Sequence, residues 1–568
     1  MSSTDVSVKI WPRTFIITET AFQLSPHAKL SPFFLKKILP YVKEKSKRGI
    51  GKVSQKMWRH ICVNKLQMSE EIGNFYFEYF LLLTSSPAER LQSIAHLGSA
   101  NNLDKMTHFN QMTAGNEGDM RKIDIYAFMC YLFFQQFHKL SLKSSYSSAT
   151  NEWPGGNSSH DLSASWGDNS MASRKVADEQ SIVLFFIEKL GSLLEVLASH
   201  TSGYLSLKAL SGLDFLFEGR VHESLEPIGD LAVRALGSGY NRESNTFTVS
   251  QFNQWLCGTL VVSPFGMQTS QSLGLKIPCP VPGIPVDSSV GGSSATIRSK
   301  IIVSTGNYIP RSVMLAHITK QTLAKTGALL QDNCIKLFRC TNSFIYLLDS
   351  VKSVHLLRCK NTTVVVGSVS TVLSVNECKN MRIIAACGKL SIQKTENSTF
   401  HILTNTNPLL LYENENLTLA PFNTWYASFT HHLTRAGLSL GVNFWNTVYC
   451  PIPEQKQSWN ILKPDNFNLF AIPFAFPELQ GVGNENSSAE NVLKYLPGDY
   501  AKSWIARQSH LTNWRGVFDS ITSEEQRLAV SEVVMNQFKH WLSSERLTTE
   551  IDSLALLTLG QMNESNPN

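Results

Sequence analysis

Hydrophobic positions recur with two different periods along the chain, and the period changes near residue 300. Between residues 10 and 140, and again from 181 toward 255, long apolar stretches without proline have the spacing of helices. The clearest are residues 57–83 and 122–140, which are apolar around much of their circumference and predict helices buried on more than one side. The helical pattern resumes at residues 181–198. From about 301 to 422 the apolar segments shorten and favour Val, Ile and Leu, which is typical of strands.

Less apolar segments separate these regions. Residues 141–175 hold eleven serines and a Trp-Pro-Gly-Gly breaker, and a segment that can bury so little is expected to be a disordered insertion. Residues 263–300 are rich in Ser, Pro and Gly, which is typical of a linker. The capping box Thr522-x-x-Glu525 predicts a terminal helix. The apolar face of that helix holds Val530, Val533, Val534, Phe538 and Trp541.

The strand-rich region contains an internal repeat. A triplet that ends in Asn returns after 19, 19, 17 and 19 residues, as Cys340-Thr341-Asn342, Cys359-Lys360-Asn361, Cys378-Lys379-Asn380, Thr395-Glu396-Asn397 and Asn414-Glu415-Asn416. Apolar residues stand five before each triplet (Ile335, Val354, Leu373, Leu390, Leu409), three before it (Leu337, Leu356, Val375, Ile392, Leu411) and three after its Asn (Ile345, Val364, Ile383, Phe400, Leu419). Such alternation is the period-two signature of strands with one buried face.

This repeat predicts a right-handed parallel β-helix. A coil of this length can form short strands joined by tight corners, and stacked coils place equivalent residues about 4.8 Å apart. The recurrent Asn suits a corner because Asn tolerates left-handed backbone angles. Cys340, Cys359 and Cys378 are expected to pack just inside that corner, without a metal or redox role. A leucine-rich repeat is the rival architecture, but the repeat leaves no room for a helix beside these strands.

The predicted fold class is therefore multidomain α+β. Its regions are a mainly helical N-terminal region (1–262), the linker (263–300), the β-helix (301–440) and a mixed C-terminal region with the terminal helix (441–568). An open solenoid end exposes unpaired strands and apolar faces. The aromatic residues after the last coil are expected to cap that end, namely Trp425, Tyr426, Phe429, Phe444 and Trp445.

Composition narrows the class of protein without naming a function. The 568 residues are 43% hydrophobic, which is enough to bury a sizeable core. The net charge of +6 is too small to indicate a nucleic-acid partner. We expect neither a signal peptide nor a transmembrane segment, because no apolar run approaches about 20 residues. The ten cysteines form no C-x-x-C, and phosphate-loop, nucleophile-elbow and zinc-protease motifs are absent from the sequence. We therefore predict no cofactor and no metal.

One stretch carries a strong local charge. Residues 36–56 contain eight basic side chains and one acidic one, a local net charge of +7. Two interpretations stay open: a solvated loop between two helices, or a docking patch for an acidic partner such as tubulin tails or anionic lipid. The patch would be formed by Lys43, Lys45, Lys47 and Arg48.

The repeat resembles the cofactor C-like (C-CAP) β-helix domain. That superfamily includes tubulin-binding cofactor C, the X-linked retinitis pigmentosa GTPase-activating protein and the adenylyl cyclase-associated proteins. One member with the same order of regions is also similar in the segments Trp58-Arg59-His60-Ile61, Lys65-Leu66-Gln67, Tyr76-Phe77-Glu78, Lys320-Gln321-Thr322-Leu323-Ala324-Lys325, Ser343-Phe344-Ile345-Tyr346-Leu347-Leu348 and Leu419-Ala420-Pro421-Phe422. The resemblance covers most of the chain.

The resemblance also identifies a degenerate catalytic segment. GTPase-activating members carry a Gln-x-Arg segment whose arginine neutralises charge on the transferring phosphoryl group, worth roughly 10³–10⁵ in rate. Here Lys389 stands at the Gln position and Ser391 at the Arg position. A serine hydroxyl carries no charge, so the resemblance implies that this chain is not an enzyme of that type. Arg339 and Arg358 align before the corner and are expected to form a solvated outer ladder rather than displaced fingers.

The resemblance implies a non-enzymatic cytoskeletal adaptor. Its expected location is the cytoplasm, at the centrosome or other microtubule-organising centre, the basal body or the spindle pole. Its expected roles are centrosome and Golgi positioning, cell shape and migration, and its expected partners are centrosomal or microtubule proteins, tubulin among them. Two alternatives stay open. One is a GTPase activator or tubulin-folding cofactor that uses a non-standard cation such as Lys389, and the other is an actin-monomer binder.

Overall fold

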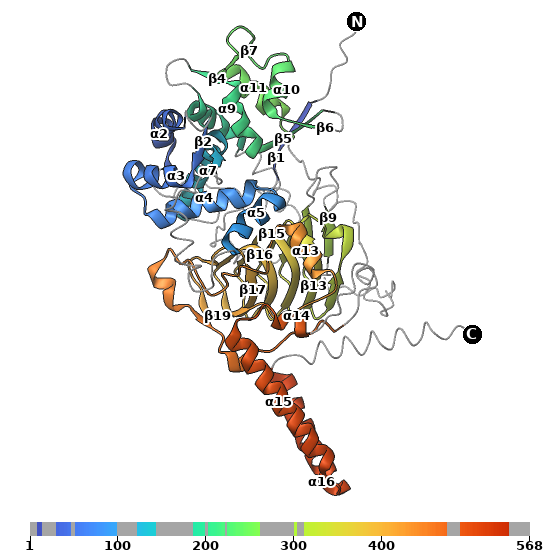
Figure 1. Ribbon diagram of the computed structural model, residues 1–568. Helices are drawn as coiled ribbons and strands as arrows, with labels where there is room; N and C mark the ends of the chain where they lie inside the picture. Colours follow the sequence, from blue (N-terminus) through green and yellow to red (C-terminus); the bar gives the residue numbers. More distant parts are fainter. Residues whose placement is uncertain are drawn as a thin grey trace, which may run out of the picture. The chain divides into compact units, whose positions relative to one another are not determined.

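The chain forms two compact units. The computed structural model describes residues 8–13, 30–46, 51–98, 122–143, 186–198, 203–221, 224–261, 300–303, 312–473 and 489–544. Unit 1 takes the described residues of 1–86, 95–274 and 304–311, and unit 2 takes those of 87–94, 275–303 and 312–568 (Figure 1). Residues 144–175 and 263–299, most of the predicted insertion and linker, lie outside the described residues.

Unit 1 is mainly helical, as the apolar periodicity predicts. Its helices are α2 (Pro32–Lys45), α3 (Gln55–Ile61), a π-helical turn (Cys62–Leu66), α4 (Glu70–Thr84), the end of α5 (Pro87–Gly98), α7 (Ile125–Lys143), residues 186–197, α9 (Leu207–Leu210), a 3₁₀ turn (Ser211–Phe215), α10 (Ile228–Arg234) and α11 (Val249–Thr259). Its short strands form three antiparallel groups: β1 (Val8–Pro12), β5 (Phe217–Val221) and β6 (Ser224–Glu226); β2 (Lys52–Ser54) and β3 (Lys122–Asp124); β4 (Tyr204–Ser206), β8 (Thr246–Thr248) and β7 (Tyr240–Asn241).

The predicted helix over 57–83 is broken into two. Gln67 adopts a left-handed φ of 52°, which ends the π-helical turn, and the Ser69 side chain then accepts the Ile72 N–H and caps α4. The break lets α3 and α4 pack together, with Trp58 Nε1 donating to the Gly73 carbonyl at 2.8 Å. The aromatic pattern predicted burial correctly, but it gave no signal for the break.

One strand pair of unit 1 joins two helix–loop–helix segments with the geometry of paired EF-hands. Strand β4 pairs with β8 through Leu205 and Phe247, and α9 or α11 follows each strand directly. Two residues before these partners, Gly203 and Asn245 have φ angles of 64° and 52°. An EF-hand loop makes such a sharp turn at its sixth position.

The second of these loops lacks a calcium ligand set. With Asn245 at the sixth position, the first, third, fifth and twelfth positions are Tyr240, Arg242, Ser244 and Gln251. None of these side chains is a carboxylate, and Ca²⁺ sites of this kind depend on several. We therefore interpret the loop as a structural connection between helices.

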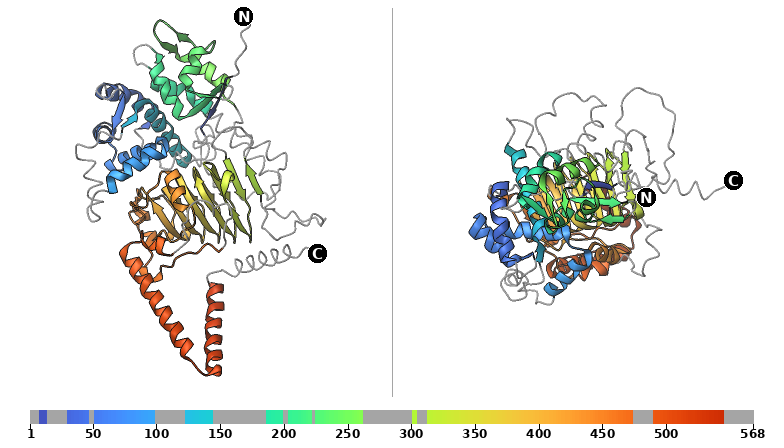
Figure 2. Two further views of the ribbon diagram at one scale, coloured as in Figure 1. Left: turned by 45° about the vertical axis from the view of Figure 1, so that its right-hand side comes forward. Right: turned by 90° about the horizontal axis from the view of Figure 1, so that it is seen from above.

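Unit 2 is built around a parallel β-helix of about six coils. One side is formed by β10 (Ser312–Ala316), β12 (Cys334–Phe338), β14 (Ser353–Leu357) and β18 (Leu409–Leu410), and another by β11 (Thr322–Lys325), β13 (Phe344–Val351), β17 (Glu396–Thr404) and β19 (Glu415–Pro421). The bent strands β15 (Thr363–Asn376) and β16 (Arg382–Gln393) run along both sides. A 3₁₀ turn covers Gly327–Leu329, and β9 (Lys300–Val303) pairs antiparallel with β10 (Figures 1 and 2).

The predicted interior ladders are confirmed, with one shift. Parallel pairing aligns Ile345, Val364, Ile383, Phe400 and Leu419, and all five lie in one buried core with the other ladders. In the last coil, however, Leu410 pairs with Ile392 and lies in that core, not Leu409 or Leu411. The chain has one more residue between this strand and the Asn corner than earlier coils have, so counting back from the corner gives the wrong face.

The aromatic cap prediction is wrong for three of its residues. The outer face of β13, β15 and β16 is covered by Trp425, Tyr426 and Phe429, which lie just before and at the start of α13 (Phe429–Ala436). That outer face is itself apolar, through Tyr346, Val365 and Ile384, so it needs a cover as much as the coil end does.

Later residues close the end of the β-helix. Strand β20 (Trp459–Ile461) pairs with β19, and Trp445, Phe467 and Tyr500 pack against the interior ladders. The remaining elements of this region are 3₁₀ turns at Pro453–Gln457 and Pro464–Asn466, α14 (Ala489–Leu493), α15 (Gly498–Ser520) and α16 (Glu524–Ser544). The first turns of α5 also belong to unit 2, where Arg90 Nη2 donates to Ser370 Oγ at 2.8 Å.

Candidate functional site

The degenerate finger segment lies on the second half of β16. Ser391 pairs with Ser374 on one neighbouring strand and with Leu409 on the other, and it is 2% exposed. Its outward row also contains Lys336 and His355. The arginine position of the relatives is thus occupied by a small, buried hydroxyl.

Lys389 is held inside the fold. Its side chain is 4% exposed, and its ammonium donates to the Asn407 carbonyl at 3.0 Å. That carbonyl belongs to the loop before β18, so the lysine ties two coils together. A cation with this bond must break it before it can reach a nucleotide phosphate.

Arg339 and Arg358 lie in a charged ladder at the first corner of the coils. Both have left-handed backbone angles, and the ladder continues with Glu377, Lys394 and Glu413. Arg358 Nε contacts Glu377 Oε2 at 2.5 Å, and the Arg339 guanidinium lies 5.2 Å from the centre of the Phe338 ring. Burial, together with the neighbouring Arg358, lowers the pKa of Arg339. Arg358 therefore links its coil to the next one, and Arg339 packs against its own neighbour in the chain.

The repeat asparagines form the second corner, and they are linked to one another. Asn342, Asn361, Asn380, Asn397 and Asn416 all have φ angles between 47° and 53°. The Asn361 amide donates to Asn342, Asn380 to Asn361 and Asn416 to Asn397, at 2.8–3.0 Å. Just inside this corner, the thiols of Cys340 and Cys359 donate to backbone carbonyls. A hydrogen bond with the cysteine of the next coil, together with burial, raises the pKa of each thiol. These residues are explained by the architecture.

The conformation of the Asn ladder gives a stability prediction. Asn380→Ala is expected to lower the free energy of unfolding by about 1–2 kcal/mol, because alanine in a left-handed conformation is strained and the amide bond to Asn361 is lost. Asn380→Gly loses the bond but not the favourable backbone, so it should cost less. Urea unfolding of the two variants tests the order. A glycine variant less stable than the alanine variant would contradict it.

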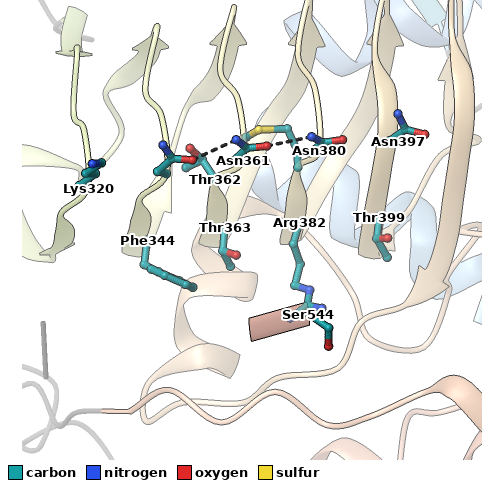
Figure 3. A pocket seen from close by; sticks show the side chains of 12 residues that line it. Lys320, Phe344, Asn361, Thr362, Thr363, Asn380, Arg382, Asn397, Thr399 and Ser544 are labelled. Carbon is teal, nitrogen blue, oxygen red and sulfur yellow. Dashed lines mark hydrogen bonds between the residues drawn. The ribbon is translucent and has the colours of Figure 1, made fainter. Parts of the chain in front are cut away.

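A groove of 470 Å³ runs along this Asn ladder (Figure 3). The amides of Asn342 to Asn397 form one wall, and the outward residues of the following strands form the floor: Phe344, Thr363, Arg382 and Thr399. Lys320 lies at one end, and Ser544 of α16 borders the groove near Arg382. The lining combines polar and apolar side chains and contains two cationic ones.

The charge around the groove is also positive. Lys360 and Lys379 occupy the corner positions next to the ladder, and Glu396 and Glu415 occupy the same position in the next coils. Lys379 and Glu396 form an ion pair at 2.5 Å. With Lys320 and Arg382, the four cations and two anions leave a net charge of +2, which favours an acidic partner.

Sequence reasoning missed this groove, although a signal for it exists. Each floor residue stands two positions after a repeat Asn, as Phe344 follows Asn342 and Arg382 follows Asn380. The residue three after the Asn faces inward, so this position must face outward.

The basic segment lies partly in a helix. Lys43 and Lys45 belong to the last turn of α2, so this part of the segment is not the loop between helices that one interpretation expected. Lys43 Nζ lies 4.8 Å from the centre of the Tyr126 ring, and burial lowers the pKa of this lysine. Lys45 lies 5.8 Å from the ring of Tyr41. Lys47 and Arg48 are outside the described residues.

Among the described residues, no cluster of three His, Cys, Asp or Glu side chains has the arrangement of a metal site. No helix in the described part of the chain is long and apolar enough to span a bilayer.

Comparison with known proteins gives a domain match within unit 2 and a similarity to relatives over nearly the whole chain. Residues 332–450 match the family profile described as Tubulin binding cofactor C. The chain is 30% identical to TBCC domain-containing protein 1 of Gallus gallus, over 98% of both proteins. It is 31% identical to the protein of that name from Xenopus laevis, over 96% of this chain and 99% of the relative. The Homo sapiens relative is 30% identical, over 96% and 97%.

Proposed function

Because the chain belongs to the TBCC domain-containing protein 1 family, we propose that it is a non-enzymatic adaptor of the cytoskeleton whose β-helix binds a tubulin-containing partner. The β-helix covers the part of the chain that is similar to tubulin binding cofactor C. A rigid side of stacked parallel strands offers a folded partner a preformed surface, which lowers the entropic cost of binding.

The observation that carries this proposal is the lack of an available cation at Lys389 and Ser391 on β16. Acceleration of GTP hydrolysis needs a cation aimed at the phosphates. Ser391 supplies none, and the Lys389 ammonium is bonded to the Asn407 carbonyl. The strand that would carry the arginine is therefore present, but it offers no cation to a nucleotide phosphate. This favours binding over catalysis.

The groove along the Asn ladder is the contact surface that we propose. Lys320 and Arg382 give it positive charge, and the ladder amides add hydrogen-bonding groups. An acidic polypeptide, such as a tubulin tail, matches both features. Affinity at such a surface should fall with ionic strength, because exposed charges are screened.

The cellular setting is part of the same proposal. The adaptor works in the cytoplasm at the centrosome, the basal body or the spindle pole. There it links microtubule-organising structures to the positions of the centrosome and the Golgi, with effects on cell shape and migration. Its removal should displace the centrosome from its usual position, as imaging of depleted cells would measure.

Two assays on the full chain test the molecular proposal. GTP hydrolysis by tubulin, and by an ADP-ribosylation-factor-like GTPase, should be unchanged by the wild-type chain or by Lys389→Met, which removes the ammonium and keeps side-chain length. The chain should co-sediment with tubulin and not with actin. Stimulated hydrolysis that is lost in Lys389→Met would establish a GTPase activator instead, and actin binding without tubulin binding would establish the actin alternative.

Matched charge reversals test the contact surface. Lys320→Glu with Arg382→Glu should weaken tubulin co-sedimentation about tenfold or more, because the groove then repels an acidic segment. Lys456→Glu with Lys502→Glu makes the same change of charge at exposed positions away from the groove, and should have little effect. Equal weakening by both pairs would show that net charge, and not the groove, determines binding.

A further inference from the structure

Helices α15 and α16 present apolar side chains to solvent. Tyr500 and Arg507 anchor the start of α15, through hydrogen bonds to the carbonyls of Leu462 and Phe467. Beyond that anchor the two helices project and diverge from the turn at 521–523 (Figure 2). Ten large apolar side chains on them are 47–70% exposed: Ile505, Leu511, Trp514, Val517, Leu528, Val533, Val534, Met535, Phe538 and Trp541.

The spacing on α15 is that of a helix packed against other helices. Trp504, Leu511 and Phe518 are seven residues apart, and Trp514 and Ile521 follow the last two of them by three. This is the a and d pattern of a coiled-coil seam. The seam needs a helical partner that supplies apolar side chains of its own.

The apolar arc of α16 is too wide for a single neighbour. At 100° per residue, the positions from Val533 through Phe538 to Leu528 span about 220° of the helix. A stripe of about 100° is enough to face one core. If α16 folded back on α15, it would bury only part of its arc, so at least two helices must pack against it. This is the arrangement of a four-helix bundle.

The exposed area fits a second copy of the same hairpin. Ten side chains about half exposed present on the order of 1,000 Å² in each copy, and a stable interface needs about 800 Å² from each partner. A two-fold pairing buries the same face on both copies, so each hairpin supplies the apolar side chains that the other one needs.

We propose that two copies of this chain associate through α15 and α16 into an antiparallel four-helix bundle, so that the protein is a homodimer. The dimer displays two β-helices, and therefore two copies of the groove. Two linked sites on one assembly raise the apparent affinity for a polymeric partner without any new contact.

The mass of the full chain in solution tests this proposal. Sedimentation at micromolar concentration should give twice the 63.4 kDa chain mass. Val534→Glu with Phe538→Glu places two charges in the apolar arc. The dissociation constant of the dimer should rise at least 100-fold, so this variant should sediment as a monomer. Both side chains are about half exposed or more, so the helices and the β-helix should stay folded, as circular dichroism and hydrogen exchange would show.

The control makes the same change of charge on the polar side of α16. Asn536→Glu with Ser543→Glu should leave the dimer intact, because both positions lie outside the apolar arc. A wild-type chain that sediments as a monomer would overturn the proposal and leave these faces to a different protein. A Val534→Glu and Phe538→Glu variant that remains a dimer would also overturn it, since the interface would then lie elsewhere.

Discussion

Lowering the pH from 7 to 5 is expected to remove about 4 kcal/mol from the free energy of unfolding of the β-helix, through two buried histidines. His355 faces outward between Lys336 and Ser374, and His401 lies between Ile384 and Ala420. Burial lowers the pKa of each to about 3, and the charges of Lys336 and Arg382 act in the same direction. Both side chains are 6% exposed, and the Nδ1 atom of each is buried without a hydrogen-bond partner.

The sign follows from the two states. Above pH 6.5, histidine is neutral in the folded and unfolded chains, and the folded state keeps its full stability. Below pH 6.5 the unfolded chain binds protons that the folded chain rejects, so stability falls until the pH nears 3. At pH 5 each histidine accounts for about 2 kcal/mol.

Hydrogen exchange of peptides from β14 to β17 measures this loss strand by strand. His355→Leu with His401→Leu should remove most of the difference in hydrogen-exchange protection between pH 7 and pH 5. The carboxylates that also titrate are common to both proteins and cancel in the comparison. The assignment is wrong if the double variant loses as much protection on acidification as the wild-type chain.

Gly367→Ala is expected to destabilise the β-helix by roughly 3 kcal/mol or more, in the upper range for overpacked cores. Gly367 lies in the bent part of β15. A Cβ at this position would lie 2.8 Å from the Asp349 carbonyl oxygen and 3.1 Å from its nitrogen, and would press on the Tyr426 hydroxyl. The backbone of the neighbouring coil cannot move away without breaking the hydrogen bonds between the coils. The coil that contains Gly367 must therefore take up the strain.

A second variant and a control make this prediction specific. Tyr426→Phe removes the hydroxyl but not the Asp349 backbone, so it should rescue Gly367→Ala only in part. Gly441→Ala is the control, since its Cβ would meet only Ser439 Oγ at 3.6 Å, and its effect should stay within about 0.5 kcal/mol. Urea unfolding measures all of these variants. Equal effects at Gly367 and Gly441 would show that the close approach is not the cause.

The comparison of sequence and structure explains why some features were predictable. Inward positions alternate along each strand, and equivalent positions recur once in every coil. Ile345, Val364 and Ile383 could therefore be predicted from a period of two and a spacing of 19 residues. The Asn corners could be predicted because few residue types tolerate a left-handed backbone. Both rules depend on residues close in the sequence.

The candidate site was harder to predict because it depends on what covers each outward face. Lys389 and Ser391 were found through the resemblance to the GTPase-activating members, but the bond from Lys389 to the Asn407 carbonyl joins two coils. Trp425 and Phe429 follow the last coil in the sequence, yet they cover the side of earlier strands. The shift at Leu410 arises from a single additional residue at a corner.

The sequence by itself determined the helical first half, the coil repeat and its interior. These follow from local geometry, because helix and strand periods and backbone tolerance act within a few residues. Only the tertiary structure decided the burial of Lys389, the groove along the Asn ladder and the exposure of the apolar faces of α15 and α16. Each of these depends on which distant segment packs against a given face, and the pattern along the chain does not contain that information.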